Sequence, residues 1–199
     1  VVFIAHALSG DAHVAGWDRD TAKNGRAWRQ RKPGWWDAIV GPGKAIDTNR
    51  YFVICPNVLG SCYGTTGPSA VDPQTGRRYG LSFPMVTVGD WVELHARLLD
   101  GLGIPRVHTV VGGSLGGQQA LEMALAYPER VERAVVLASS ARLSAQGLAF
   151  NAVARYCILN DPHFAGGDYY DRGVGPDNGL AAARMLAHIT YLSDEGMHE

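Results

Sequence analysis

A serine surrounded by glycines is the first group in this sequence with an evident chemical use. Residues 110–117 read VVGGSLGG, and the pattern G-x-S-x-G is centred on Ser114. It lies between an apolar β-branched run (107–113) and an apolar helical repeat (115–131), where a nucleophilic serine on a tight strand-to-helix turn is found. Because glycine has no Cβ, the backbone can fold back sharply and leave the hydroxyl projecting. The pattern predicts that Ser114 is a catalytic nucleophile.

Two backbone N–H groups are expected to face this hydroxyl. The first turn of a helix has free N–H groups, so Leu115 N–H is predicted to stabilise negative charge on a bound carbonyl oxygen. The second donor should come from the loop after an earlier strand, and HALSG (6–10) follows VVFIA there, which indicates Leu8 N–H. The alternatives are a glycine turn that only packs helix against sheet, or a phosphate-binding loop. The glycines do not fit G-x-G-x-x-G.

The elements around these groups predict an α/β fold. Four short apolar runs, at 1–8, 51–59, 107–113 and 133–140, are typical of buried parallel strands. Helical spacing over 87–103 and 115–131 alternates with them, so we expect a mostly parallel sheet with helices on both faces. After residue 140 only helical segments follow, around a Gly- and Asp-rich loop, which predicts a helical cap. We expect a partial core at 1–140, a partial cap at 141–199, and a fragment that lacks both ends.

Composition favours a globular protein with a small-molecule site. The 199 residues are 46% hydrophobic and carry a formal net charge of -1, so no strong field gathers nucleic acid or an anionic membrane. No apolar run approaches the roughly 18 residues of a membrane span. The three cysteines form no disulfide framework and match no zinc spacing. We therefore expect a cytoplasmic protein with no metal, nucleic-acid or membrane partner.

Longer blocks of the sequence resemble one family. The blocks HALSGDAHVAG, GPGKAIDT, NVLGSCYGTTGP, GGSLGGQQALEMALAYPERV and HITYLS occur in this order, and together they resemble the homoserine O-acetyltransferases, α/β-hydrolase-fold enzymes of methionine biosynthesis. The resemblance implies that Ser114 takes an acetyl group from acetyl-CoA, a co-substrate rather than a resident cofactor, and passes it to the hydroxyl of L-homoserine. It implies that Arg184 binds the amino-acid carboxylate, the alternative being a solvated helix arginine. It also implies a homodimer formed through the cap helices.

Three alternative functions stay open. Homoserine and serine O-succinyltransferases share most of these blocks, so the donor is also consistent with succinyl-CoA. A serine hydrolase or esterase would use the same turn and the same donors, although the long cap and Arg184 favour a transferase. A non-catalytic binding module is the third, because none of His163, His188 and His198 lies where this fold places the general base. We therefore expect the 199 residues alone to be inactive.

Other polar residues are interpreted as structural. His6 and His13 flank the expected oxyanion loop and are interpreted as hydrogen-bonded residues near a strand end, and Asp11 as a turn acid. A further hypothesis places Arg29 or Arg31 near the phosphates of CoA.

Overall fold

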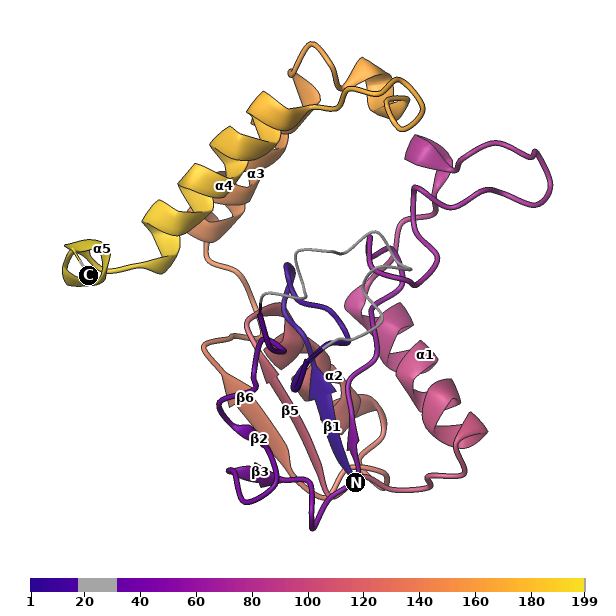
Figure 1. The fold of residues 1–199 in the computed structure, drawn as a ribbon, viewed down its shortest axis with the longest axis vertical. Coiled ribbons are helices and arrows are strands. Elements are labelled where there is room, and N and C mark those ends of the chain that lie inside the picture. The colour runs from indigo at the N-terminus through magenta and orange to yellow at the C-terminus, as the bar shows by residue number, and fades with distance from the viewer. Residues whose placement is uncertain (18–31, 199) are drawn as a thin grey trace. The chain divides into compact units, whose positions relative to one another are not determined.

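The computed structural model describes residues 1–17 and 32–198 (Figure 1), so Arg29 and Arg31 lie outside the described residues. The chain divides into two compact units. The first comprises Val1–Thr66 and Met85–Ala141, and the second Gly67–Pro84 and Arg142–Glu199. The expected division at 1–140 and 141–199 keeps residues 67–84 in the core, and the structure differs there. One reason is an ion pair of 3.0 Å between Arg78 Nε and Asp171 Oδ1, which joins this segment to the cap sequence.

The first unit contains a parallel sheet whose strand ends meet at one edge. Strands β1 (Val2–Ala5), β4 (Val53–Ile54), β5 (Thr109–Gly113) and β6 (Ala134–Leu137) lie in the order β4-β1-β5-β6. All neighbouring pairs are parallel, with Ala5 opposite Gly112 and Gly113 opposite Leu137. The loop after β1 and the turn after β5 therefore leave the sheet side by side, which brings residues 6–10 next to Ser114.

Two helices and an irregular segment cover this sheet. Helix α1 (Val88–Gly101) begins with a capping box between Thr87 and Asp90, and α2 (Leu115–Ala126) follows β5 directly. Both helices pack on one face of the sheet, in a core formed by Phe3, Val92, Leu99, Val107, Val110, Ala120, Met123 and Val131. The other face packs against residues around Trp35 and Trp36 and against β2 (Val40–Gly41), which pairs with β3 (Ile46–Asp47).

The expected elements are present, with shorter strands. The run at 51–59 contributes only Val53 and Ile54 to the sheet, paired with Val2 and Phe3. Pro56 follows two residues later and has no N–H to donate, so the ladder cannot continue through it. The helix expected to begin at residue 115 and to end before Pro128 does so, because α2 ends at Ala126.

The second unit is built on a pair of packed helices, α3 (Ala145–Leu159) and α4 (Asp177–Tyr191). They approach closely at Gly179, where a Cβ would lie 2.3 Å from Cys157 O. The carboxylate of Asp161 accepts hydrogen bonds from Gly179 N–H (2.7 Å) and His163 N–H (2.8 Å), so it caps the first turn of α4. The shorter elements are η3 (Gly80–Ser82), η4 (Ala165–Gly167) and α5 (Asp194–His198). In the described part of the chain, no helix combines the length and apolarity needed to cross a membrane.

Candidate active site

Ser114 lies at the joint between β5 and α2, with its side chain exposed. Its φ of 53° and ψ of -120° lie outside the regions that L residues usually adopt, a conformation that costs on the order of 1–3 kcal/mol. Hydrogen bonds hold its backbone: Ser114 N–H donates to Leu137 O (3.0 Å), while Ser114 O accepts from Gly117 N–H (2.9 Å), Gln118 N–H (3.2 Å) and the Ser139 hydroxyl (2.7 Å). The structure places Ser114 on the expected strand-to-helix turn. Its role as a nucleophile stays a prediction.

Three of the four surrounding glycines have no room for a side chain. A Cβ at Gly112 would lie 2.1 Å from the carbonyl oxygen of Gly116, and one at Gly116 would lie 2.0 Å from the last carbonyl oxygen of β1. At Gly117 a Cβ would lie 2.5 Å from the Cβ of Ser139. Gly113 differs, because the nearest atom to its Cβ would be 3.8 Å away. Close packing of α2 against β1, β5 and the segment after β6 therefore explains three of the glycines.

Two unengaged N–H groups lie next to this turn, as expected. Leu115 is the first residue of α2, and its N–H has no hydrogen-bond partner among the described residues. The same is true of Leu8 N–H, in a tight turn closed by a 2.9 Å hydrogen bond from Gly10 N–H to Ala7 O. The side chain of Leu8 is 78% exposed, so this residue contributes its backbone here and not its side chain to the core. The two donors suit stabilisation of an oxyanion, and this role stays a prediction.

His6 is buried directly before that turn and is held in its neutral form. Its Nδ1–H donates to Ala7 O (2.8 Å) and its Nε2 accepts from Val58 N–H (3.2 Å). Only a neutral imidazole can donate at one nitrogen and accept at the other. Burial lowers the pKa of His6, partly opposed by its hydrogen bond to Ala7. The interpretation of His6 as a structural residue agrees with these contacts.

The neighbouring polar residues also have structural partners. His13 Nε2 bonds to Gly16 O (2.9 Å), and Asp11 Oδ1 accepts from His13 N–H (2.9 Å), as a turn acid does. Burial raises the pKa of the Cys55 thiol to about 12, which removes it as a thiolate nucleophile. Across residues 1–17 and 32–198, no group of three or more His, Cys, Asp or Glu side chains is arranged to hold a metal ion.

Arg184 and the histidines of the second unit each have their own surroundings. Arg184 lies on α4 in the second unit, where its side chain is exposed and its guanidinium has no partner within the described ranges. No described histidine hydrogen-bonds the Ser114 hydroxyl. His188 instead bonds to Arg184 O (2.9 Å) within α4, and His163 lies beside Asp161. The role of Arg184 stays a prediction.

Two residues near the site were not expected from the sequence. Gln119 is buried on α2, and its amide reaches both His6 O (3.1 Å) and Nε2 of His95 (3.0 Å) on α1. The sequence offered one signal: a glutamine on the apolar side of a helix that begins next to the predicted nucleophile. His95 offered another, since it lies on the core-facing side of α1.

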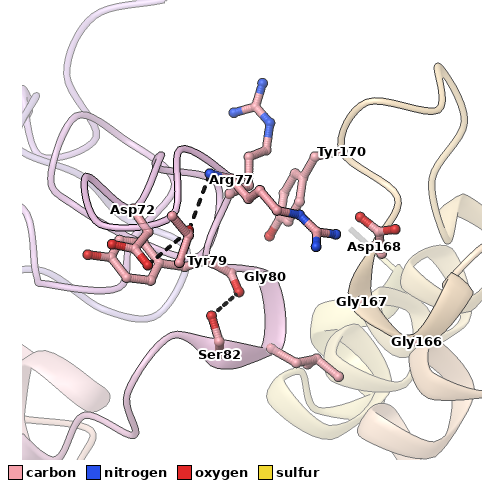
Figure 2. A pocket seen from close by; sticks show the side chains of 12 residues that line it. Asp72, Arg77, Tyr79, Gly80, Ser82, Gly166, Gly167, Asp168 and Tyr170 are labelled. Atoms are coloured by element: carbon pink, nitrogen blue, oxygen red, sulfur yellow. Dashed lines mark hydrogen bonds between the residues drawn. The ribbon is translucent and has the colours of Figure 1, made fainter.

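A separate cavity of about 340 Å³ lies within the second unit (Figure 2). One wall comes from the segment around η3 and the other from the segment around η4. Gly167 lies where they meet; its φ is 87°, and a Cβ there would be 2.5 Å from Leu81 Cγ. The polar lining residues are Asp72, Thr75, Arg77, Arg78, Tyr79, Ser82, Asp168 and Tyr170.

Comparisons with known proteins agree with this architecture and with the predicted resemblance. Residues 2–194 match the family described as alpha/beta hydrolase fold. A homoserine O-acetyltransferase from Methanococcoides burtonii is 56% identical over 198 residues, which cover 100% of this chain and 39% of that protein. A homoserine O-succinyltransferase from Halorhodospira halophila is 55% identical over 98% of this chain and 49% of its own length.

A solved structure is also similar. The crystal structure of esterase E22 has a TM-score of 0.84 and 37% sequence identity, covering 98% of this chain and 52% of that one. The chain thus spans about half or less of the length of these proteins. The resemblance to homoserine acyltransferases that the sequence blocks predict is confirmed.

Proposed function

Because this chain belongs to the alpha/beta hydrolase fold family, we propose that it carries the nucleophile and oxyanion hole of an acyltransferase that moves an acetyl group from acetyl-CoA to the hydroxyl of L-homoserine. The observation that supports this most directly is the geometry at Ser114: a strained, exposed serine at the start of α2, beside the unengaged N–H groups of Leu115 and Leu8. The homoserine acyltransferases among its relatives supply the substrate class.

The reaction proceeds in two halves on the same serine. The Ser114 oxygen attacks the thioester carbonyl, and the resulting oxyanion accepts hydrogen bonds from Leu115 N–H and Leu8 N–H. The C–S bond then breaks and CoA leaves with a proton as the thiol. The hydroxyl of L-homoserine attacks the acetyl-serine through a second tetrahedral intermediate, which releases O-acetylhomoserine and restores Ser114. Each half needs a general base. We assign no described residue to that role.

The proposal includes three finer points. Arg184 binds the acceptor carboxylate, because its unengaged guanidinium presents a planar fork that matches a carboxylate. Acetyl-CoA is a co-substrate, and no resident cofactor takes part. The protein is a cytoplasmic homodimer that associates through α3 and α4, which expose many apolar side chains, among them Leu148, Tyr156, Met185 and Ile189.

Two alternatives have specific support. The succinyltransferase from H. halophila is about as similar as the acetyltransferase, so succinyl-CoA is the alternative donor. The similarity to an esterase supports water as the alternative acceptor.

One experiment separates these functions. The natural full-length protein is mixed with acetyl-CoA or succinyl-CoA, with and without L-homoserine or L-serine, and thiol release is followed together with the mass of the protein. The proposal expects an acetyl adduct on Ser114 and release of CoA that depends on L-homoserine. Release at the same rate without an acceptor indicates a hydrolase. Absence of any adduct in the wild type, with the same result for Ser114→Ala, indicates a binding module.

A further inference from the structure

A buried chain of hydrogen bonds connects α1, α2 and the loop that carries Leu8. At its centre is the amide of Gln119, which is 1% exposed. Its Nε2 donates to His6 O at 3.1 Å and more weakly to Leu115 O at 3.4 Å, and its Oε1 accepts from His95 Nε2–H at 3.0 Å. Both ends of the side chain are therefore engaged.

The partners of Gln119 are themselves fixed. His95 is 2% exposed and packs its ring against Phe3, with centroids 4.9 Å apart. Burial lowers its pKa, partly opposed by the bond to Gln119, which favours the neutral imidazole. Its Nε2 carries the proton because the glutamine atom that faces it is the amide oxygen. The carbonyl oxygens of His6 and Leu115 can only accept hydrogen bonds, so they turn the NH2 end of the amide toward the loop and leave its oxygen facing His95. On the other side, His6 is held through its ring by Val58 and Ala7.

The position of Gln119 connects the two predicted oxyanion donors. It lies in the second turn of α2, the helix whose first residue supplies Leu115 N–H, and it holds the carbonyl of His6, two residues before Leu8. One helix thus provides one oxyanion donor and ties down the backbone that carries the other. We infer that Gln119 is the positioning residue of the oxyanion hole, with His95 holding the oxygen end of its amide in place.

The test is kinetic and rests on the proposed function. Removal of one oxyanion-hole donor costs about 10²–10³ in kcat. Gln119→Met keeps the length of the side chain and releases the loop without deleting Leu8 N–H, so we expect kcat to fall about 10-fold to 100-fold with KM unchanged within about twofold. His95→Phe keeps the ring packing and removes only the hydrogen bond, so its kcat should fall less.

The matched control is Gln118→Met. Gln118 is the next residue of α2, and its amide makes a single 3.4 Å hydrogen bond to Ser140 O, away from the oxyanion loop. Its kcat and KM should stay at wild-type values. Equal effects of the two substitutions, or an unchanged kcat for Gln119→Met, would overturn the inference.

A second measurement does not depend on acyl transfer. Amide hydrogen exchange of the segment 6–10 should accelerate in Gln119→Met and not in Gln118→Met. Circular dichroism should show that both variants are folded. If the wild type transfers no acyl group, the proposed function fails, and this exchange result still decides whether Gln119 holds the loop. Unchanged exchange overturns the inference. If Gln119→Met does not fold, the exchange of segment 6–10 is measured in His95→Phe instead.

The cavity in the second unit carries an independent inference, because one of its two arginines is engaged within the protein and the other is left for a ligand. Arg78 Nε bonds to Asp171 (3.0 Å), and its guanidinium carbon lies 5.9 Å from the centroid of the Tyr170 ring. Tyr170 in turn stacks on Tyr169, with ring centroids 4.5 Å apart. Arg78 is therefore held by Asp171, and the stacked Tyr170 ring gives the cavity an aromatic surface suited to a ring compound.

The acidic residues of this cavity are already neutralised or used. Asp72 accepts hydrogen bonds from Gln74 N–H (2.9 Å) and the Thr75 hydroxyl (3.0 Å), and Asp168 pairs with Arg172 at 3.2 Å. The guanidinium of Arg77 has no partner in the part of the chain that the structure describes. Arg77 is therefore the cation left for a ligand.

We propose that this cavity binds the phosphorylated adenosine end of the acyl-CoA donor, an inference that rests on the proposed function. Calorimetry with adenosine 3′,5′-bisphosphate should show binding to the full-length protein, weakened about tenfold in Arg77→Ala, the loss expected for one charge-assisted hydrogen bond. Arg97→Ala, on the exposed side of α1, should bind like the wild type. The affinity for adenosine, which lacks phosphate, should not change in Arg77→Ala. Inorganic phosphate should compete with the bisphosphate for binding.

No binding by the wild type, or equal binding by Arg77→Ala, overturns this proposal. Binding of the bisphosphate by a protein that transfers no acyl group would instead separate the cavity from the proposed reaction.

Discussion

Gly116 offers the most direct test of the geometry around Ser114. In Gly116→Ala the new Cβ would lie 2.0 Å from Ala5 O, 2.8 Å from Ala5 C and 3.1 Å from His6 C. All three are backbone atoms at the end of β1, so no side chain can rotate away to make room. Ordinary van der Waals contact begins near 3.4 Å, which means that α2 and β1 must separate by about 1.4 Å.

That displacement should reduce both stability and rate. Overpacking of this kind costs about 1–3 kcal/mol of unfolding free energy. The separation also moves Leu115 N–H relative to the backbone of Leu8, and a misplacement of about 1 Å can cost on the order of 10²-fold in rate. Gly116→Ala should therefore unfold at lower urea concentration and retain about 1% of the wild-type kcat under conditions where it is fully folded.

The matched comparison is Gly113→Ala, directly before Ser114 in the sequence but without the steric conflict. Its Cβ would have 3.8 Å of clearance, and alanine is favoured over glycine within a strand by about 0.5–1 kcal/mol. Its urea midpoint should equal or exceed that of the wild type. The reasoning is refuted if Gly116→Ala is as stable and as active as the wild type, or if Gly113→Ala loses as much stability as Gly116→Ala.

Three further predictions concern titration and capping. Burial lowers the pKa of His6 and His95, so below about pH 6.5 the unfolded chain binds protons that the native chain does not. The unfolding free energy should therefore fall as the pH drops, by up to about 1.4 kcal/mol per pH unit for each histidine. Urea midpoints that stay constant from pH 7.5 to pH 5 would contradict this. Asp161→Ala should lower the melting temperature of the helix pair by about 2–4 °C through loss of the cap on α4, measured by circular dichroism, whereas an unchanged midpoint would show the cap to be dispensable. With its pKa raised to about 12, Cys55 should resist iodoacetamide at pH 8 while exposed Cys62 reacts, and equal labelling in mass spectra of the folded protein would rule out this burial.

Local features of the fold could be predicted because their causes are local in the sequence. The strand, the tight turn and the helix around Ser114 are adjacent along the chain, so apolar spacing and glycine placement were enough to predict them. The loop with Leu8 followed from its position after the first strand. The exact ends of strands were not predictable in this way. β4 is shorter than its apolar run because strand length depends on which backbone groups find a partner.

Long-range polar contacts could not be predicted, because nothing in the local sequence encodes them. Gln119 meets His6 across 113 residues and His95 across 24, and Arg78 meets Asp171 across 93. Glutamine and histidine are common on helices for reasons unrelated to such contacts. Only the folded packing of α1 and α2 on one face of the sheet shows that these side chains meet in a buried place, where each must find a partner.

The chemistry assigned to this site depends on backbone atoms more than on the residues that carry them. Leu8 and Leu115 contribute N–H groups that almost any residue would supply, and the exposed side chain of Leu8 adds little to packing. The close approach of backbone segments restricts which residues are tolerated here. Gly116 lets α2 reach the end of β1, and Gln119 holds the loop that follows β1 through a hydrogen bond to His6 O. The residues that determine the proposed reactivity of Ser114 are thus largely those that place peptide groups around it.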